Sequence, residues 1–131
     1  MFSVQEQIKH DQLAGVSNDI SVLADLEDDW DAEGASAVNV TCIAEAKSFI
    51  TLLECEATNE RSEWILPTVN PTVDGGLQLY WFTPWGQTAI TFRSGRQEVE
   101  VQRKQLNETG EFRSVPVTEA VKIAVRAMRG A

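Results

Sequence analysis

The feature that most constrains the fold is a change in the hydrophobic period of the chain near residue 63. Before this position, apolar residues recur at intervals of three and four, which is typical of helices that bury one face. After it, apolar and polar residues alternate, which is typical of strands with one buried side. The two patterns predict an α+β fold, and the 131 residues suit one domain that spans 1–131.

Two helices are expected in the N-terminal part. The first has an apolar stripe made of Leu13, Val16, Ile20, Leu23, Leu26 and Trp30. Gly15 predicts a break or a bend in this helix, with Ser17 available as the cap of its second half. The second helix is expected to start after Asn39, a favourable N-cap residue, and to continue to about Ala57.

The rest of the chain predicts an antiparallel meander of about four strands and a C-terminal helix packed on the sheet. The expected strands are Trp64–Val69, Leu77–Phe82, Thr88–Arg93 and Glu98–Arg103, with a weaker further candidate at Phe112–Val115. Val99 and Val101 are expected to point inward. The last helix should be capped near Thr118 and bury Val121, Val125 and Met128.

The second expected strand carries large side chains on both faces. Leu79 and Trp81 share one face, whereas Tyr80 and Phe82 share the other, and Trp85 follows in the next turn. Three helices can cover one face, so the face of Tyr80 and Phe82 is expected to be covered by a helix, a second protomer or a partner. A platform for stacked nucleic-acid bases is the alternative. The few basic residues that could accompany it are Arg93, Arg96, Arg103 and Lys104.

The segment from residue 25 to residue 34 is the most acidic part of the chain. Its candidate partner-binding residues are Asp25, Glu27, Asp28, Asp29, Trp30, Asp31 and Glu33. They follow the C-terminal end of the first expected helix, where the helix macrodipole disfavours carboxylates. Such departures from local rules are enriched at functional sites.

Three interpretations of this segment stay open. A calcium loop would use acids at 29, 31 and 33 followed by Gly34, but Ala37 and Val40 occupy positions that should complete it, so no metal site is predicted. A docking face for a basic partner would use Trp30 as its aromatic anchor. A solvated bend would instead turn Trp30 into the core between the two helices.

The net charge of −9 is unevenly distributed along the chain. Residues 1–92 contain fifteen acidic and three basic residues, a net charge of −12, whereas residues 93–131 contain five acidic and eight basic residues, a net charge of +3. This balance argues against nucleic acid as a ligand. It favours a protein partner with a basic surface, because complementary charge speeds encounter and filters partners.

The sequence predicts a cytoplasmic protein. The N-terminus lacks the apolar core of a signal peptide, and no apolar run approaches the roughly 20 residues that cross a bilayer, so no membrane association is expected. Cys42 and Cys55 lie about 220° apart around the second expected helix and therefore cannot pair with each other. Free thiols are typical of a reducing compartment.

No catalytic residue and no cofactor are predicted. His10 is the only histidine and lies in a polar segment. The chain has no nucleophile elbow, phosphate loop or zinc-binding pattern. The acids of residues 25–34 are expected to lie in the open, where burial would not raise a carboxyl pKa for acid–base chemistry. The sequence therefore indicates a protein that is not an enzyme.

Two segments carry a resemblance. Residues 30–35 (WDAEGA) and residues 67–81 (PTVNPTVDGGLQLYW) resemble small uncharacterised bacterial proteins in which a WDGxGA-like element precedes a PxVxPxxDGGxxLxW hairpin. This chain has Ala32 where that pattern has glycine. The resemblance implies a shared fold without a known activity, and an association with mobile elements and with defence or toxin–antitoxin neighbourhoods.

Two functions follow as hypotheses. The first is a small acidic protein-binding module, of the inhibitor, antitoxin or immunity type, that masks a basic surface of a partner. The alternative is a self-associating structural or regulatory subunit that dimerises through the sheet face of Tyr80 and Phe82.

Overall fold

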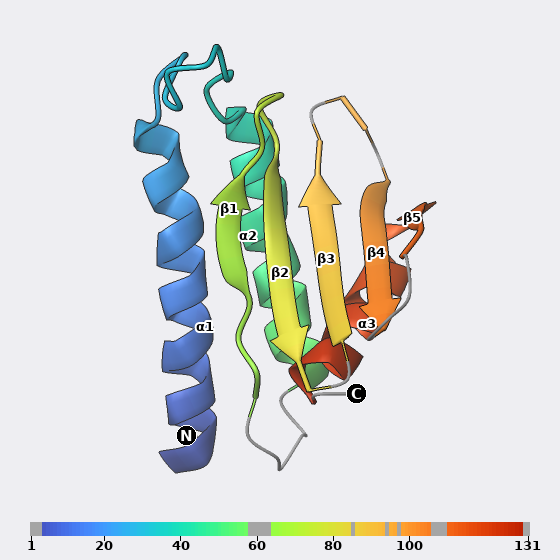
Figure 1. The fold of residues 1–131 in the computed structure, drawn as a ribbon. Helices are drawn as coiled ribbons and strands as arrows, with labels where there is room; N and C mark the ends of the chain where they lie inside the picture. Colours follow the sequence, from blue (N-terminus) through green and yellow to red (C-terminus); the bar gives the residue numbers. More distant parts are fainter. Residues whose placement is uncertain are drawn as a thin grey trace.

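Helices and strands form two layers in this protein (Figure 1). The computed structural model describes residues 4–57, 64–84, 86–93, 95–96, 98–105 and 110–129. Within these ranges, three helices lie on one side of a five-stranded antiparallel sheet. The predicted α+β class, with two N-terminal helices and one C-terminal helix, is confirmed.

The first helix, α1 (Val4–Val22), passes through Gly15 without a break and ends in a single 3-10 turn, η1 (Leu23–Asp25). The predicted break at Gly15 is therefore wrong. A glycine costs a helix only about 1 kcal/mol, and the buried side chains of Val16 and Ile20 hold this turn against the rest of the core. Ser17, the expected cap, lies inside the helix, where its carbonyl accepts a hydrogen bond from Ser21 Oγ.

The second helix, α2 (Val40–Ala57), has the predicted bounds. Asn39 caps it as expected, because its Oδ1 accepts a hydrogen bond from the backbone N–H of Thr41 at 2.8 Å. Cys42 is buried and Cys55 is exposed, and the structure records both as free thiols. Burial raises the pKa of the Cys42 thiol.

The strands follow one another across the sheet in chain order (Figure 1). They are β1 (Thr68–Pro71), β2 (Leu77–Thr83), β3 (Gly86–Phe92), β4 (Val99–Gln105) and β5 (Phe112–Val115). The weaker candidate at residues 112–115 is thus a true strand, so the described sheet has one strand more than the four expected. The predicted antiparallel meander is otherwise confirmed.

The predicted strand Trp64–Val69 is wrong in its first half. Residues 64–67 run beside the end of the C-terminal helix, and the Ile65 N–H donates to the carbonyl of Met128 at 2.9 Å. The Ile65 carbonyl accepts a hydrogen bond from Trp81 Nε1 at 3.0 Å. These groups bind outside the sheet and Pro67 has no N–H to offer, so pairing begins only at Thr68.

The C-terminal helix, α3 (Val117–Met128), begins before Thr118, the expected cap. Pro116 holds the N-cap position with an extended backbone, and no side chain caps the helix. The Pro116 carbonyl accepts hydrogen bonds from the N–H groups of Glu119 and Ala120. The predicted inward residues Val121, Val125 and Met128 are buried.

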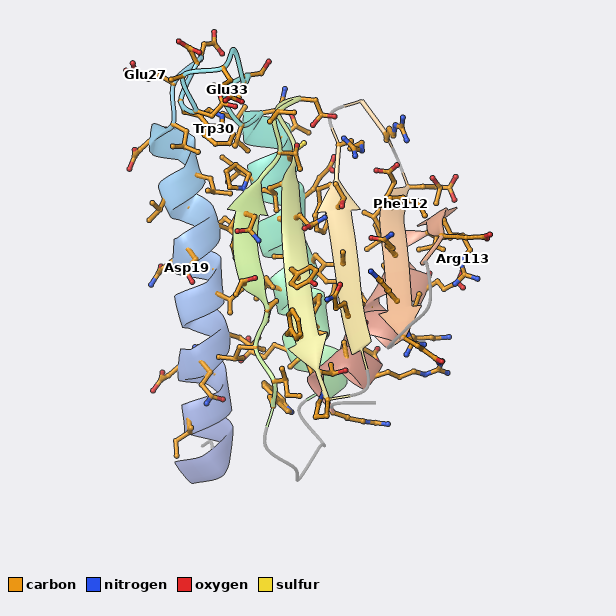
Figure 2. All side chains as sticks on the ribbon, viewed as in Figure 1. Asp19, Glu27, Trp30, Glu33, Phe112 and Arg113 are labelled. Carbon is orange, nitrogen blue, oxygen red and sulfur yellow. The ribbon has the colours of Figure 1, made fainter. Side chains whose placement is uncertain are left out.

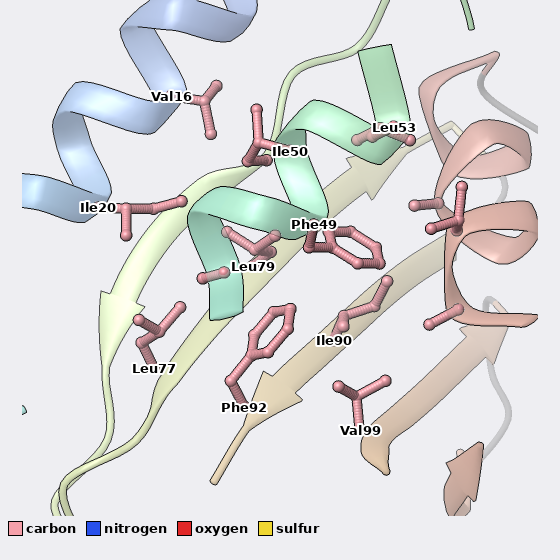
Figure 3. Packing of buried hydrophobic residues seen from close by; sticks show 14 of the residues in the cluster. Val16, Ile20, Phe49, Ile50, Leu53, Leu77, Leu79, Ile90, Phe92 and Val99 are labelled. Carbon is pink, nitrogen blue, oxygen red and sulfur yellow. The ribbon is translucent and has the colours of Figure 1, made fainter. Parts of the chain in front are cut away.

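The core lies between the sheet and the three helices (Figure 3). Leu79 of β2 pairs with Ile90 of β3, which pairs with Val101 of β4, so the three side chains share the helix-facing side of the sheet. Phe49 of α2 packs edge-on against Phe92 of β3, with ring centroids 5.5 Å apart. None of the described helices has the length and apolar character that a membrane-crossing helix needs.

Candidate functional site

The acidic loop, defined as residues 25–34, connects the end of α1 to the segment before α2 (Figure 2). Two of its carboxylates bind backbone groups of the same connection. Asp28 Oδ1 accepts a hydrogen bond from the Ala37 N–H at 2.9 Å, and Asp29 Oδ1 accepts one from the Gly34 N–H at 2.7 Å. These acids therefore fold the loop with one carboxylate oxygen each, while both side chains stay exposed.

Asp31 has the same structural role. Its Oδ1 accepts hydrogen bonds from the N–H groups of Glu33 at 2.9 Å and Ala35 at 3.0 Å. These two bonds favour the ionised form and lower the pKa of the Asp31 carboxyl below its usual range. The sequence placed seven residues of this segment in one candidate site, and the structure separates loop-forming acids from displayed ones.

The loop turns sharply because several residues adopt a left-handed backbone. The φ angles are 66° at Asp29, 61° at Ala32 and 88° at Gly34. Gly34 adopts this conformation easily, and Asp tolerates it better than most residues. Ala32 occupies the position at which the resembling WDGxGA pattern has glycine, so the backbone keeps a glycine-type conformation on a residue that resists it.

Ala32→Gly is therefore expected to raise the free energy of unfolding by about 0.5–1 kcal/mol. Relief of the steric cost of positive φ, about 1–2 kcal/mol, outweighs the extra chain entropy of glycine. The matched control is Ala44→Gly on the exposed side of α2, which should lower stability by about 1 kcal/mol. Urea unfolding of the three proteins measures both effects, and a loss of stability in Ala32→Gly would contradict the assigned loop conformation.

The segment that follows the acidic loop packs on the turn between β1 and β2. The Ser36 N–H donates to the Val73 carbonyl at 2.9 Å, and the Asn39 N–H donates to the Gly75 carbonyl at 2.8 Å. The approach is close, since a Cβ at position 75 would lie 3.2 Å from the Ala37 carbonyl oxygen. The residues that directly follow the first resembling segment thus contact the turn within the second, and together they form one structural unit.

Trp30 belongs to this unit and not to the main core. Its Nε1 donates a hydrogen bond to the Ser36 carbonyl at 2.8 Å, and its side chain is half-buried beneath the acidic loop (Figure 2). The buried cluster between helices and sheet does not include it. The hypothesis that Trp30 turns inward between the two helices is therefore wrong, because its indole N–H takes a partner, Ser36, in the segment just after the acidic loop.

The displayed acids of the loop are Asp25, Glu27 and Glu33. All three are exposed, and no ion pair within the part of the chain that the structure describes involves them. Among the described residues no group of three potential metal ligands occurs. The loop therefore presents three carboxylates on a backbone that its other carboxylates hold in place.

A charged network that sequence reasoning missed lies beside this unit. Arg93, just after β3, bonds through its guanidinium to both Asp74 and Glu100. A hydrogen bond from the Thr72 hydroxyl, followed by the charge of Arg93, lowers the pKa of Asp74. Because the three residues come from different parts of the sheet, only their pairing in space reveals the network.

The outer face, meaning the side of the sheet away from the helices, is the second candidate site. The residues that alternation places on it are Thr68, Asn70, Gln78, Tyr80, Phe82, Gln87, Ala89, Thr91, Glu100, Gln102, Lys104, Phe112 and Ser114. No described helix or strand covers this face (Figure 1). Of the three covers that the sequence predicted, a helix of the same chain is therefore absent from the described residues.

The aromatic residues of the outer face are the predicted Tyr80 and Phe82 together with Phe112. The rings of Tyr80 and Phe82 meet edge-on with centroids 5.8 Å apart. Phe82 is 67% exposed and Phe112 is 59% exposed. Trp85 lies outside the described residues. Phe112 was missed as a site residue because its strand had a weak sequence pattern, although a strand there would have placed it opposite Gln102.

Two further features have little chemistry of their own. The single histidine, His10, pairs with Glu54 across α1 and α2, and this hydrogen bond raises the pKa of His10 on an exposed surface. A groove of about 360 Å³ lies between α2 and the start of α3, over Phe49 and Phe92. Glu45 supplies its one charged group, so the groove offers mainly apolar contact.

Fold and sites together define a class: an α+β protein with helices on one sheet face, an open second face with aromatic residues, and an acidic loop held by its own hydrogen bonds. Comparison of the chain with known proteins finds no matching family model, no similar curated protein and no similar solved structure. The resemblance to small bacterial proteins therefore stays a prediction.

Proposed function

We propose that this protein is a cytoplasmic, non-enzymatic protein-binding module whose acidic loop recognises a basic surface of another protein. Inhibitors, antitoxins and immunity proteins act in this manner. The observation that carries the proposal is the display of Asp25, Glu27 and Glu33 on a loop whose remaining acids hold its backbone.

The rigidity of the loop favours binding. A loop that is already ordered loses less conformational entropy when it meets a partner, so more of the interaction energy contributes to affinity. The hydrogen bonds of Asp28, Asp29 and Asp31 supply that order. The displayed carboxylates gather in one place and repel each other, and a basic partner would relieve that repulsion.

The distribution of charge supports the same proposal. Asp19, Glu27 and Glu33 lie on the α1 side of the molecule, whereas Arg113 lies at the opposite edge on β5 (Figure 2). These three acids and Arg113 therefore lie apart, although Arg93 of the C-terminal part pairs with Asp74 of the N-terminal part. A separated charge distribution orients an approaching basic protein toward the acidic loop before contact.

The exposed positions of the titratable groups argue against a catalytic role. An acid–base residue needs a protected site in which its pKa is tuned, whereas His10 and the displayed acids of the loop are all exposed. The free thiols Cys42 and Cys55 agree with a cytoplasmic location, where disulfides are rare.

The proposal is tested with a triple variant, Asp25→Asn, Glu27→Gln and Glu33→Gln. Wild-type protein should recover a stoichiometric partner from a lysate of its host, with binding that weakens as salt rises from about 50 to 300 mM. The triple variant should lose most of that partner, because all three displayed charges are gone while the hydrogen bonds that fold the loop remain.

The matched control removes three exposed carboxylates elsewhere, as Glu56→Gln, Glu98→Gln and Glu111→Gln. Both triple variants change the net charge by +3, so only the position of the charges differs. Equal loss of the partner in both variants would mean that overall charge, and not the acidic loop, directs binding. Retention of the partner by the loop variant would reject the proposal outright.

A further inference from the structure

We infer that Arg93 is a positioning residue for the acidic loop: it ties the turn between β1 and β2 to β4, and that turn carries the segment on which the loop rests. This role rests on the function proposed above and deepens it, because it names what keeps the displayed acids in place. The order of the loop and the capture of a partner are measured separately, so the failure of one proposal is distinguishable from the failure of the other.

Arg93 lies at the end of the sheet at which the turn between β1 and β2 leaves it. Leu77, the first residue of β2, pairs with Phe92, the residue before Arg93. The Arg93 Nη1 donates to Asp74 Oδ2 in the turn, and its Nε donates to Glu100 Oε2 on β4. One guanidinium therefore ties the turn to β4 across the end of β3.

Arg93 is a better tie than its neighbour Arg96. The side chains of Arg93 and Glu100 are 30% and 18% exposed, so water and salt screen their charges less than those of a fully exposed pair. The Thr72 hydroxyl donates to Asp74 Oδ1, which leaves Oδ2 in a fixed direction for Arg93. Arg96 is 55% exposed, and its ion pair in the described part of the chain is with Glu100, at 3.7 Å. Arg93 thus links the turn to the sheet, and Arg96 offers a matched comparison.

The turn binds the segment that follows the acidic loop through the two residues that flank Asp74. The Val73 carbonyl accepts a hydrogen bond from the Ser36 N–H at 2.9 Å. The Gly75 carbonyl accepts one from the Asn39 N–H at 2.8 Å. Ser36 and Asp74 themselves form an isolated parallel bridge. Because both accepting carbonyls are adjacent to Asp74, a displacement of this residue moves them both.

The same segment also binds the acidic loop. The Ser36 carbonyl accepts a hydrogen bond from Trp30 Nε1 at 2.8 Å, so Ser36 contacts the turn through its N–H and the loop through its carbonyl. The next residue, Ala37, donates its N–H to Asp28 Oδ1 at 2.9 Å. A connected set of hydrogen bonds therefore runs from β4 through Arg93 and the turn to the acidic loop.

The positioning role of Arg93 predicts an effect on binding opposite to that of its charge. Arg93→Gln makes the net charge of −9 more negative by one, which alone would strengthen attraction to a basic partner. Loss of the tie instead loosens the acidic loop, so more conformational entropy is lost when a partner orders it. A more acidic protein that binds the basic partner more weakly is therefore the signature of the role.

Amide hydrogen exchange of the purified full chain, followed by NMR, tests whether Arg93 holds the loop. The rate at each N–H reports the fraction of time for which its hydrogen bond is open. The reporters are the N–H groups of Ser36 and Asn39, and the reference is that of Ile65, which precedes the other end of β1 and binds Met128. Arg93→Gln should speed exchange at the two reporters at least about threefold relative to the reference.

Asp74→Asn cuts the same tie from its other side. Asparagine keeps an oxygen for the Thr72 hydroxyl, but its amide nitrogen replaces Oδ2 and cannot accept from Arg93. Glu100 keeps its partner, so this variant decides the question even where Arg93→Gln does not fold. The two variants change the net charge in opposite directions, so faster exchange in both excludes charge as the cause. The double variant should exchange no faster than Arg93→Gln alone, because both changes break one tie.

Arg96→Gln is the matched control. It removes the same charge close to Arg93 and weakens a contact with the same Glu100, yet its ion pair does not include Asp74. Exchange at Ser36 and Asn39 should stay as in the wild type. An equal rise in Arg96→Gln would overturn the role of Arg93. So would unchanged exchange in Asp74→Asn, or a rise in either variant that is equal at the reporters and the reference, because Arg93 would then stabilise the whole fold alone.

Capture of the host partner from a lysate connects the order of the loop to binding. Arg93→Gln and Asp74→Asn should recover less of the partner than Arg96→Gln does. Recovery by Arg93→Gln that equals or exceeds that of the wild type would overturn the role in binding. A wild type that recovers no partner would reject the proposed function alone, because the exchange measurement needs no partner and still decides whether Arg93 holds the loop.

Discussion

Trp81→Ala is expected to lower the free energy of unfolding by about 3–5 kcal/mol, the largest effect of any core truncation in this chain. Trp81 is fully buried between the sheet and the helices, and its Nε1 binds the carbonyl of Ile65. Its removal leaves a large cavity. It also frees residues 64–67, the segment before β1 that runs beside the end of α3. Because domains of this size are stable by about 5–15 kcal/mol, the variant should be close to unfolding at room temperature.

The next residue along the strand is the matched control. Phe82 is also a large aromatic residue on β2, but it points to the outer face and is 67% exposed. Phe82→Ala should change the free energy of unfolding by less than about 1 kcal/mol. Urea unfolding compares the two variants. Similar losses in both would mean that the two faces of the sheet are not distinguished as described.

Gly76→Ala is expected to destabilise the protein by about 3 kcal/mol or more, or to prevent folding. A Cβ at this position would lie 2.3 Å from the Phe92 carbonyl oxygen and 2.9 Å from Thr72 Oγ1. The first contact is with backbone of β3, which cannot move without opening the pairing of β2 with β3. The change therefore disrupts the turn together with the adjoining end of the β2–β3 pairing.

The same substitution at Gly15 should have the opposite sign. Gly15 lies inside α1, and a Cβ there would meet no atom within 4 Å. Gly15→Ala should raise the free energy of unfolding by about 0.5–1 kcal/mol, because alanine is the better helix former. Thermal unfolding followed by circular dichroism measures both glycine variants. A stable Gly76→Ala protein with an unchanged melting temperature would contradict the strand register.

Much of the fold could be predicted from the sequence because its periodic signals agree with the packing. The alternation around Leu79, Trp81 and Val101 assigned the inner side of the sheet correctly. Asn39 marked the start of α2 because its side chain has a local partner in Thr41. Interactions between residues close in sequence are the ones that a linear pattern records.

The errors arose where distant parts of the chain compete with a local signal. Gly15 suggested a break, but packing of the surrounding buried residues keeps α1 continuous. Ile65 had a strand pattern, but its backbone binds Met128 and Trp81 instead. Thr118 had the chemistry of a cap, yet Pro116 occupies that position. None of these outcomes is visible without the tertiary contacts.

The candidate sites also combine features that a local sequence pattern shows with features that only the tertiary contacts determine. The concentration of acids was plain from the sequence, but which of them fold the loop depends on backbone N–H groups up to nine residues away, as between Asp28 and Ala37. Trp30 looked like a core residue because it continues the stripe of α1, yet its partner is Ser36, just after the acidic loop. The contribution of Phe112 to the outer face followed only from the pairing of β5 with β4.

The hydrogen bond between Ile65 and Met128 has a consequence for the order of folding. The strands pair with their neighbours in the chain, and α1 packs on α2, so these parts can form from contacts of short sequence separation. The contact that joins residues 65 and 128 must wait until α3 has been synthesised. Until then, the inner side of β3 and β4 lacks the cover that α3 provides, and Ile90 and Val101 are open to solvent. The newly made chain is therefore most prone to aggregate just before α3 leaves the ribosome.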